Sequence, residues 1–188
     1  MMMDITEVQQ KLATGAMSSR VLLSRTKVFD ESVRSCSIYA DNRHFPFYYY
    51  LGQQIKPEKV MQVGPYLGLP AACFLQGCRS VKEWLCVGER TRITESNIQL
   101  HCKGWVVMVD WDSSFFEPYK SDIAFLSQQF PKEDAMGHME FLWDHLEPEG
   151  LLVVDYITVS SAFTDFCRVK NRDPIIFQTR HSVGIVQR

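Results

Sequence analysis

The chain has 188 residues, the length of one domain, and its 46% apolar and 22% charged residues are typical of a globular protein. Its formal charge of −2 excludes the broad positive field that attracts nucleic acid or an anionic membrane, so we expect neither partner. The six cysteines form no C-x-x-C pair, which predicts reduced thiols. No run approaches the ~20 apolar residues of a membrane span, and the first residues lack a signal peptide's basic flank and apolar stretch. We therefore expect a cytoplasmic protein.

The first 56 residues have the pattern of a helical extension. Val8, Leu12 and residues 21–23 supply weak apolar stripes, and an aromatic-rich helix is predicted over 44–55, just before Pro57. We expect these helices to form a cap over one face or mouth of the sheet that follows. The aromatic side chains could wall a substrate pocket or could simply pack; they are Phe45, Phe47, Tyr48, Tyr49 and Tyr50.

From residue 59 onward, β-rich runs alternate with helix-length segments, the pattern of βαβ units in a parallel sheet. The first five predicted strands are 59–64, 83–88, 106–111, 122–126 and 150–157. The predicted helices are 69–76, 90–101, 133–146 and 160–169, the third of them ended by Pro148 and Gly150. The nearly continuous apolar character of the third and fourth strands is typical of strands covered on both faces.

The end of the chain predicts an antiparallel hairpin. Residues 174–179 and 183–187 form two further β-rich runs, separated only by Arg180-His181-Ser182. Seven strands result, and no repeat, low-complexity tract or linker divides the chain. We therefore expect a single domain over 1–188, made of an N-terminal helical extension (1–56) and an α/β core (57–188).

Two passages near the end of the chain match those of a known family. Residues 141–156 (FLWDHLEPEGLLVVDY) resemble the passage L-x-P-G-G-x-x-x-x-D before and along that family's fifth strand, and residues 184–186 (GIV) resemble its closing strand. The family is the class I S-adenosylmethionine-dependent methyltransferases, in particular their small O-methyltransferase-like members. The resemblance implies a Rossmann-like α/β/α sandwich of three layers, a mostly parallel sheet of order 3-2-1-4-5-7-6 and S-adenosylmethionine as cofactor.

The turn after the first strand, residues 62–68 (QVGPYLG), carries two of the three glycines that the family places after an acidic residue as G-x-G-x-G. Glycine lets the chain turn sharply and lets a ligand lie against the backbone. Gln62 stands at the acidic position and Tyr66 at the middle glycine, which leaves open an altered cofactor site; Gly64 and Gly68 could also make only a tight turn. A nicotinamide-binding G-x-G-x-x-G motif fits worse, because only its first glycine is present.

Further cofactor contacts are implied after the second and third strands. Glu89 lies about 20 residues beyond Gly68, where both dinucleotide and S-adenosylmethionine folds place an acid for the ribose; a surface glutamate beside Arg90 is the alternative. Asp112-Ser113 resembles the pair that contacts adenine, although Asp110 or a turn cap could account for it. With the end of the fourth strand included, the cofactor-binding candidates are Gln62, Gly64, Pro65, Tyr66, Gly68, Glu89, Arg90, Asp112, Ser113 and Ser127.

The methyl-accepting side contains few charged candidates. Metal-dependent members carry an aspartate after the fourth strand and Asp-Asp or Asp-Asn after the fifth, whereas this chain has Ser127-Gln128-Gln129 and Asp155-Tyr156. We therefore expect no metal site. Asp155 is the catalytic candidate, because ligands gather at the carboxyl ends of parallel strands, but it could also cap the following helix.

The sequence thus predicts a metal-independent methyltransferase that acts on a small-molecule acceptor. The alternative is a divergent, non-catalytic relative that keeps the fold and binds an adenosyl ligand or has lost the cofactor site. His138 and His145 are expected to be surface or boundary residues of the long helix. Because small members of the family often dimerise through added helices, the resemblance also implies a homodimer.

Overall fold

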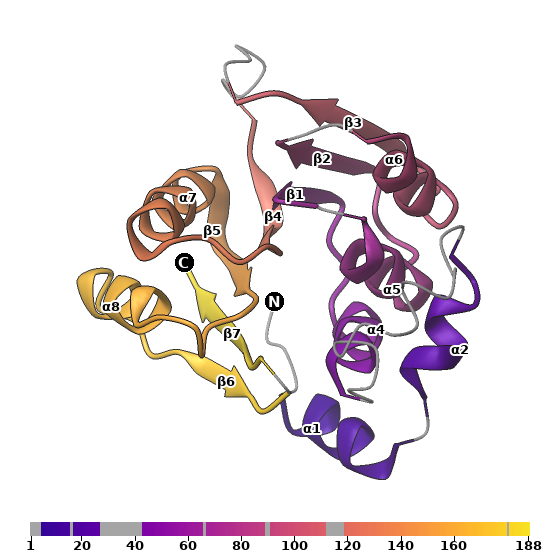
Figure 1. The fold of residues 1–188 in the computed structure, drawn as a ribbon, viewed down its shortest axis with the longest axis horizontal. Helices are drawn as coiled ribbons and strands as arrows, with labels where there is room; N and C mark the ends of the chain where they lie inside the picture. Colours follow the sequence, from indigo (N-terminus) through magenta and orange to yellow (C-terminus); the bar gives the residue numbers. More distant parts are fainter. Residues whose placement is uncertain are drawn as a thin grey trace.

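A computed structural model of the chain describes residues 5–15, 17–26, 43–65, 67–88, 91–111, 119–179 and 181–188, with a seven-stranded sheet at its centre (Figure 1). The strands are β1 (Lys59–Val63), β2 (Glu83–Val87), β3 (Trp105–Val109), β4 (Ser121–Leu126), β5 (Leu146–Val154), β6 (Ile175–Phe177) and β7 (Val183–Gln187). The helices are α1 (Ile5–Thr14), α2 (Ser19–Leu23), α4 (His44–Gln54), α5 (Leu69–Gly77), α6 (Arg92–Gln99), α7 (Lys132–Asp144) and α8 (Ala162–Val169).

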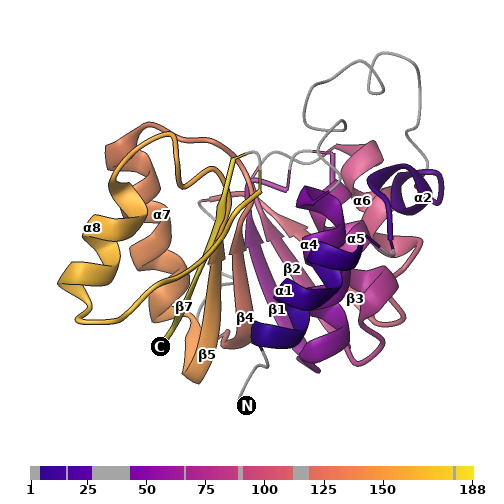
Figure 2. The same cartoon turned by 90° about the horizontal axis from the view of Figure 1, so that it is seen from below.

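The strand order is β3-β2-β1-β4-β5-β7-β6, as the family resemblance implied. Strands β1 to β5 run parallel, while β7 is antiparallel to both β5 and β6, which confirms the terminal hairpin. Helices α7 and α8 cover one face of the sheet and the other helices cover the opposite face, giving three layers (Figure 2). None of the described helices has both the length and the apolarity that a bilayer span requires.

Helix α4 packs on α5 with unusually close backbones. A Cβ atom at Gly52 would lie 2.3 Å from the Phe74 carbonyl oxygen, and one at Gly77 would lie 2.0 Å from the Tyr49 carbonyl oxygen. Only glycine fits at either position, because real Cβ atoms do not approach backbone oxygen so closely. The predicted cap therefore joins the helix layer on one face of the sheet.

The aromatic residues of α4 pack into the main core. Phe45, Phe47, Tyr48 and Tyr50 are buried, and only Tyr49 is half-buried. The Phe47 ring lies 4.8 Å from that of Phe177, and the Tyr48 ring lies 6.0 Å from that of Phe125. Aromatic pairs at such distances add to the burial of apolar area, so packing explains this group.

The largest difference from the predicted elements occurs between α7 and β5. The helix ends at Asp144, and β5 already begins at Leu146, which pairs with Ser121 before the register shifts. Pro148 therefore lies inside the strand that it was expected to precede, and Gly150, expected to begin the strand, lies in its middle, with Glu149 at φ +66° between the two. The bulge allows an irregular segment of the chain to remain hydrogen-bonded to β4.

Five of the six cysteines fall in the described ranges, and they confirm the predicted buried thiols: Cys73, Cys78, Cys86, Cys102 and Cys167 are all free and buried. Burial raises the pKa of the Cys73 and Cys86 thiols. Since the thiolate is the nucleophilic form, these groups are chemically inert parts of the core.

Candidate functional site

Gln62 and Ser127 lie together where β1 and β4 end side by side. Both are buried, and the Gln62 side-chain nitrogen donates a hydrogen bond of 2.9 Å to the Ser127 hydroxyl oxygen. The Gln62 side-chain oxygen accepts a hydrogen bond of 3.1 Å from the Trp84 indole nitrogen. The Gln62 amide, which stands at the family's acidic position, is thus already hydrogen-bonded through both its nitrogen and its oxygen. Both residues were predicted at the cofactor site, but nothing in the sequence indicated the bond between them.

The backbone conformation and packing of the turn after β1 require glycine at two positions. Gly64 has φ +65°, and a Cβ there would lie 2.6 Å from the Gln128 Cβ. Gly68 has φ +71°, and a Cβ there would lie 2.9 Å from the Thr94 carbonyl oxygen. The Gly68 amide also donates to the Pro65 carbonyl at 2.7 Å, which closes the turn. A tight turn therefore accounts for both glycines, whether or not a ligand lies against them.

A third glycine, Gly88, lies where the ends of β1 and β2 come together. Its φ is +123°, and the atoms nearest to a Cβ placed there would be the Gly64 nitrogen and the Pro65 Cδ, each 4.0 Å away. A Cβ at this position would therefore be in ordinary van der Waals contact with the turn after β1. The sequence prediction included Gly88 only as the last residue of a strand, although a glycine directly before the predicted ribose acid is a signal that could have identified it.

The N-terminus of α5 faces this same edge without a side-chain cap. Gly68 is the N-cap residue and offers no side chain, Pro70 lacks an amide hydrogen, and the first turn holds no acidic residue. Amide groups at a helix N-terminus attract anions such as carboxylates. Asn97 of α6 holds the preceding loop in place through a 2.9 Å hydrogen bond to the Leu67 carbonyl. The sequence placed Asn97 only within the predicted helix 90–101.

A pocket of about 580 Å³ opens beyond the carboxyl ends of β4 and β5, and we call it the β4–β5 pocket. It is lined by Ser127, Gln128, Gln129, Phe130, Pro131, Lys132, Tyr156, Val159 and Ser160. None of the described residues that line it carries a carboxylate, and the amine of Lys132 is held by Ser161 at 2.8 Å and Asp165 at 2.6 Å. Neutral amides, hydroxyls and aromatic rings therefore dominate the lining.

Asp155 follows β5, and its carboxylate is directed toward α4. It is 4% exposed, and its Oδ2 lies 3.7 Å from Nε2 of His44, which is 1% exposed; Tyr48 lies beside the same carboxylate. Among the described residues, the His44 Nδ1 has no hydrogen-bond partner, while the Tyr48 hydroxyl lies close enough to the Asp155 carboxylate to act on its pKa as a hydrogen-bond donor. Burial raises the pKa of Asp155, and His44, Tyr48 and His181 offset part of that rise.

The surroundings of Asp155 test one of its two predicted roles. Helix α8 begins at Ala162 with Ser161 as its N-cap, so the interpretation of Asp155 as the cap of that helix is wrong. Its catalytic role stays a prediction. No pattern in the sequence marked His44, because the contact joins the first residue of α4 to the end of β5, far apart in the chain.

Five predicted cofactor residues, Tyr66, Glu89, Arg90, Asp112 and Ser113, lie outside the described residues. His138 and His145 are half-buried, as expected of boundary residues. The His138 ring stacks on Trp111 with 4.5 Å between centroids, and burial lowers its pKa. Among the described side chains, no three His, Cys, Asp or Glu residues come together as ligands for a metal ion.

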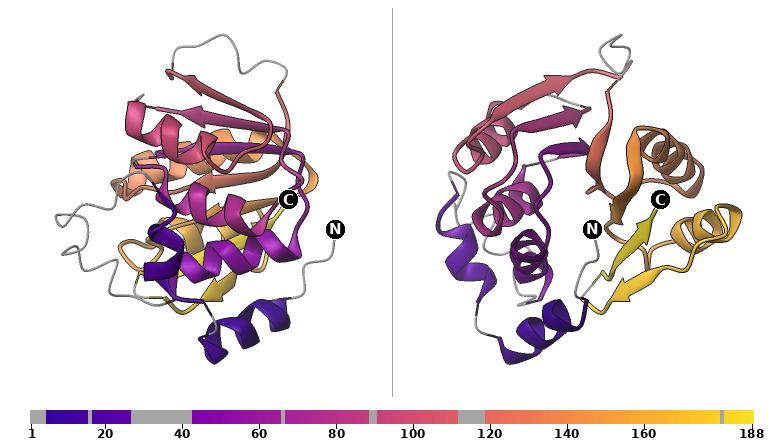
Figure 3. Two further views of the ribbon diagram at one scale, coloured as in Figure 1. Left: turned by 90° about the vertical axis from the view of Figure 1, so that its right-hand side faces the viewer. Right: turned by 180° about the vertical axis from the view of Figure 1, so that it is seen from behind.

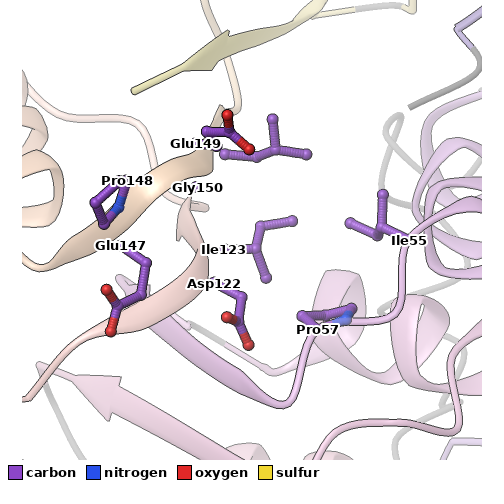
Figure 4. Close-up of a pocket in the computed structure, with 9 residues that line it drawn as sticks. Ile55, Pro57, Asp122, Ile123, Glu147, Pro148, Glu149 and Gly150 are labelled. Atoms are coloured by element: carbon purple, nitrogen blue, oxygen red, sulfur yellow. The ribbon is translucent and has the colours of Figure 1, made fainter. Parts of the chain in front are cut away.

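A second pocket, of about 160 Å³, lies at the opposite, amino-terminal edge of the sheet (Figure 4). Asp122, Glu147 and Glu149 border it, and an Asp122 carboxylate oxygen accepts the backbone amides of Glu58 and Lys59 at 2.7 and 2.9 Å. Because ligands of open parallel sheets bind at the carboxyl ends of the strands, this pocket is not the candidate site.

Solved structures with the same fold are O-methyltransferases and related enzymes. TomG from Streptomyces achromogenes, an O-methyltransferase solved with SAM, superimposes with a TM-score of 0.63 at 8% identity, covering 99% of each chain. An SAH-bound O-methyltransferase from Bacillus cereus gives 0.58 at 9% identity, covering 96% of this chain and 100% of that one. The SAH-bound methyltransferase PaMTH1 from Podospora anserina gives 0.60 at 13% identity, covering 94% and 86%.

These likenesses establish the fold. It is the fold of the class I S-adenosylmethionine-dependent methyltransferases, as the resemblance of residues 141–156 and 184–186 implied. No protein-family model and no curated protein sequence matches the chain.

Ser127→Ala should lower the free energy of unfolding by about 1–3 kcal/mol, because it leaves the buried Gln62 amide without its acceptor. Urea unfolding measures the loss. Thr164→Ala is the control, since its hydroxyl is exposed and bonds only to the Ser161 carbonyl. Equal losses in the two variants would mean that the Gln62–Ser127 bond contributes nothing particular to stability.

Proposed function

We propose that the protein is an S-adenosylmethionine-dependent methyltransferase that acts on a small molecule, at an oxygen atom and without a metal ion. The observation that carries the proposal is the turn after β1, where Gly64 and Pro65 lie next to Gly88 and lead toward the N-terminus of α5, which has no side-chain cap. It lies at the carboxyl edge of the sheet, where ligands of such folds bind. The SAM and SAH bound to proteins of the same fold support the choice of cofactor.

The described residues fit such a cofactor. The N-terminus of α5, which has no side-chain cap, suits its carboxylate, and Gly64 and Gly88 leave the backbone bare for a group laid against it. Bound S-adenosylmethionine would supply an electrophilic methyl group. Since this transfer is an in-line displacement, the protein mainly has to align the two reactants.

The β4–β5 pocket is the proposed acceptor site. Gln128, Gln129 and Ser160 offer neutral donors and acceptors, and Phe130 and Tyr156 offer flat apolar surfaces. This lining favours a small, uncharged acceptor that carries both a hydroxyl group and an apolar or aromatic part.

Metal independence rests on the two positions that would supply ligands. Ser127 is neutral and bonded to Gln62, and the Asp155 carboxylate is buried against His44 and Tyr48. Hard cations such as Mg²⁺ bind several oxygen ligands, usually including carboxylates. EDTA should therefore leave methyl transfer unchanged, and loss of activity with recovery by magnesium would contradict this part of the proposal.

A second candidate function is a non-catalytic relative that binds an adenosyl ligand. It is favoured by Gln62, which brings a neutral amide, already bonded to Ser127 and Trp84, to the family's acidic position. Incubation with S-adenosylmethionine and a panel of small phenols and alcohols separates the two: formation of S-adenosylhomocysteine supports the enzyme, and binding without turnover supports the relative.

S-adenosylhomocysteine should stabilise the protein by about 2.7 kcal/mol at a concentration of 100 times its Kd, whereas NAD and ATP should not. Thermal shift and calorimetry measure this effect. Gly88→Val should abolish it, because φ is +123° and the branched side chain would extend from a Cβ position already 4.0 Å from the Gly64 nitrogen and the Pro65 Cδ, and so cover the bare backbone that the ligand needs.

Gly137→Val is the matched control, because Gly137 lies on an exposed face of α7 with no atom near its Cβ position. Unchanged binding by a folded Gly88→Val variant would show that the cofactor site is misplaced. A parent protein that binds none of the adenosyl ligands would overturn the proposed function itself.

A further inference from the structure

Strand β3 forms one end of the sheet and, among the described strands, pairs only with β2. Figures 1 and 3 show it at the end of the sheet opposite β6. Its sequence, WVVMV, contains no charge and no proline, the residues that usually block edge strands from pairing with another chain. Trp105 is 78% exposed and the other four residues are half-buried. The strand is therefore an unprotected edge.

The hydrogen bonds to β2 determine which residues of β3 can pair outward. The Trp105 amide donates to the Lys82 carbonyl at 2.8 Å, and the Val109 carbonyl accepts the Gly88 amide at 3.1 Å. In a parallel pair, alternate residues make both bonds to the neighbouring strand, so residues 105, 107 and 109 face β2. Val106 and Met108 direct their amide and carbonyl groups away from the sheet. An added strand has to bond to these two residues.

The charges beside β3 favour an antiparallel copy of the same strand. Lys103 precedes the apolar segment and Asp110 follows it, and both are exposed. A two-fold axis through Val107 pairs Val106 of one copy with Met108 of the other, which satisfies the outward groups of both. The same axis brings Lys103 of each copy to the end that carries Asp110 of the other. A parallel arrangement would place like charges together instead.

The exposed apolar residues near this edge are arranged to suit the same partner. In that register Trp105 lies opposite Val109 of the second copy, and Lys103 lies opposite Trp111, which stays 43% exposed although its ring stacks on His138. Helix α6 packs on β3 and carries the exposed Ile93, so the axis brings the two α6 helices to one face of the joined sheets. The paired edges would therefore bury apolar surface as well as backbone groups.

We propose that two copies of the chain pair through antiparallel β3 strands, centred on Val107, to join their sheets into one. The interface is isologous, because the same residues contribute from each copy. It differs from the dimer through added helices that the family resemblance implied, and it does not depend on the proposed enzymatic activity.

Sedimentation velocity over a range of protein concentrations tests the proposal. The parent should be a dimer, and Met108→Pro should make it a monomer, because proline removes the outward amide of an edge strand and leaves the bonds to β2 intact. Trp105→Lys should weaken the dimer, whereas Val169→Lys should not, since Val169 is exposed on α8. Circular dichroism checks that each variant is folded.

A charge exchange separates self-pairing from other dimers. Lys103→Glu alone and Asp110→Lys alone should each raise the dimer dissociation constant about tenfold, since each replaces two attractions across the axis with two repulsions. The double variant should return to the parent value. A monomeric parent, a larger assembly, or a dimer indifferent to Met108→Pro and to the single charge reversals would overturn the proposal.

Discussion

His44→Ala should lower the free energy of unfolding by about 3–5 kcal/mol, the usual loss when one partner of a buried ionisable pair is removed. His44 Nε2 lies 3.7 Å from the Asp155 carboxylate, both side chains are almost fully buried, and the imidazole also packs edge-on against Phe45 and Tyr48. The substitution leaves the carboxyl group with Tyr48 and the more distant His181. Urea unfolding near neutral pH measures the loss.

The raised pKa of Asp155 determines the direction in which the free energy of unfolding changes with pH. The pKa of Asp155 is higher in the folded chain than in the unfolded one, so the unfolded chain releases this proton first and stability falls as pH rises through the interval between the two pKa values. His44→Ala removes a group that lowers the folded pKa, so the fall should extend to higher pH. Asp155→Asn should abolish the fall.

A double-mutant cycle supplies the control. If His44 acts through the carboxylate, His44→Ala should cost less stability when Asp155 is already Asn. Additive losses, with the same pH profile in the parent and in Asp155→Asn, would show that the two side chains are not energetically coupled.

Gly64→Ala should destabilise the fold by about 3 kcal/mol and also weaken S-adenosylhomocysteine binding. An L-residue in the left-handed region costs about 1–2 kcal/mol, and forcing an atom into a packed site typically adds 1–3 kcal/mol. At Gly64 both terms apply, because φ is +65° and the new Cβ would lie 2.6 Å from the Gln128 Cβ. Urea unfolding and calorimetry measure the two effects.

Gly15→Ala is the matched control, because Gly15 has a nearly identical φ of +62° but no atom within 4 Å of its Cβ position. The difference between the two variants isolates the contact with Gln128. Equal destabilisation, together with unaltered ligand binding by Gly64→Ala, would mean that the turn tolerates a side chain and does not contact the cofactor.

The strands were predictable because each strand of the core is a short apolar run between helix-length segments, whereas their order was implied only by the family resemblance. The pairing of residues 146–150 was not predictable, because Pro148 and Gly150 normally end an element. In the structure a register shift keeps this part of the chain paired with β4. The close packing of α4 on α5 could not be predicted from the sequence either. It depends on Gly52 and Gly77, whose role appears only when the two backbones are placed side by side.

Part of the candidate site follows from the pattern and part does not. Gln62 and Ser127 were placed at one edge because parallel strands bring their carboxyl ends together. The hydrogen bond that occupies both of them depends on rotamers and on Trp84 of a third strand. The burial of Asp155 against His44 could not be foreseen either, because an isolated histidine among aromatic residues has the pattern of ordinary core packing.

The contact of α4 with α5 at Gly52 and Gly77 determines what the N-terminal extension can do around a ligand. A lid has to rock or slide, but Gly52 of α4 meets the Phe74 carbonyl and Gly77 of α5 meets the Tyr49 carbonyl with no room for even a methyl group. Tilting α4 would also separate His44 from Asp155. The helix is therefore a static wall. In the proposed function, an acceptor therefore reaches the β4–β5 pocket without movement of α4, past lining residues at the start of α7 and at positions 156, 159 and 160.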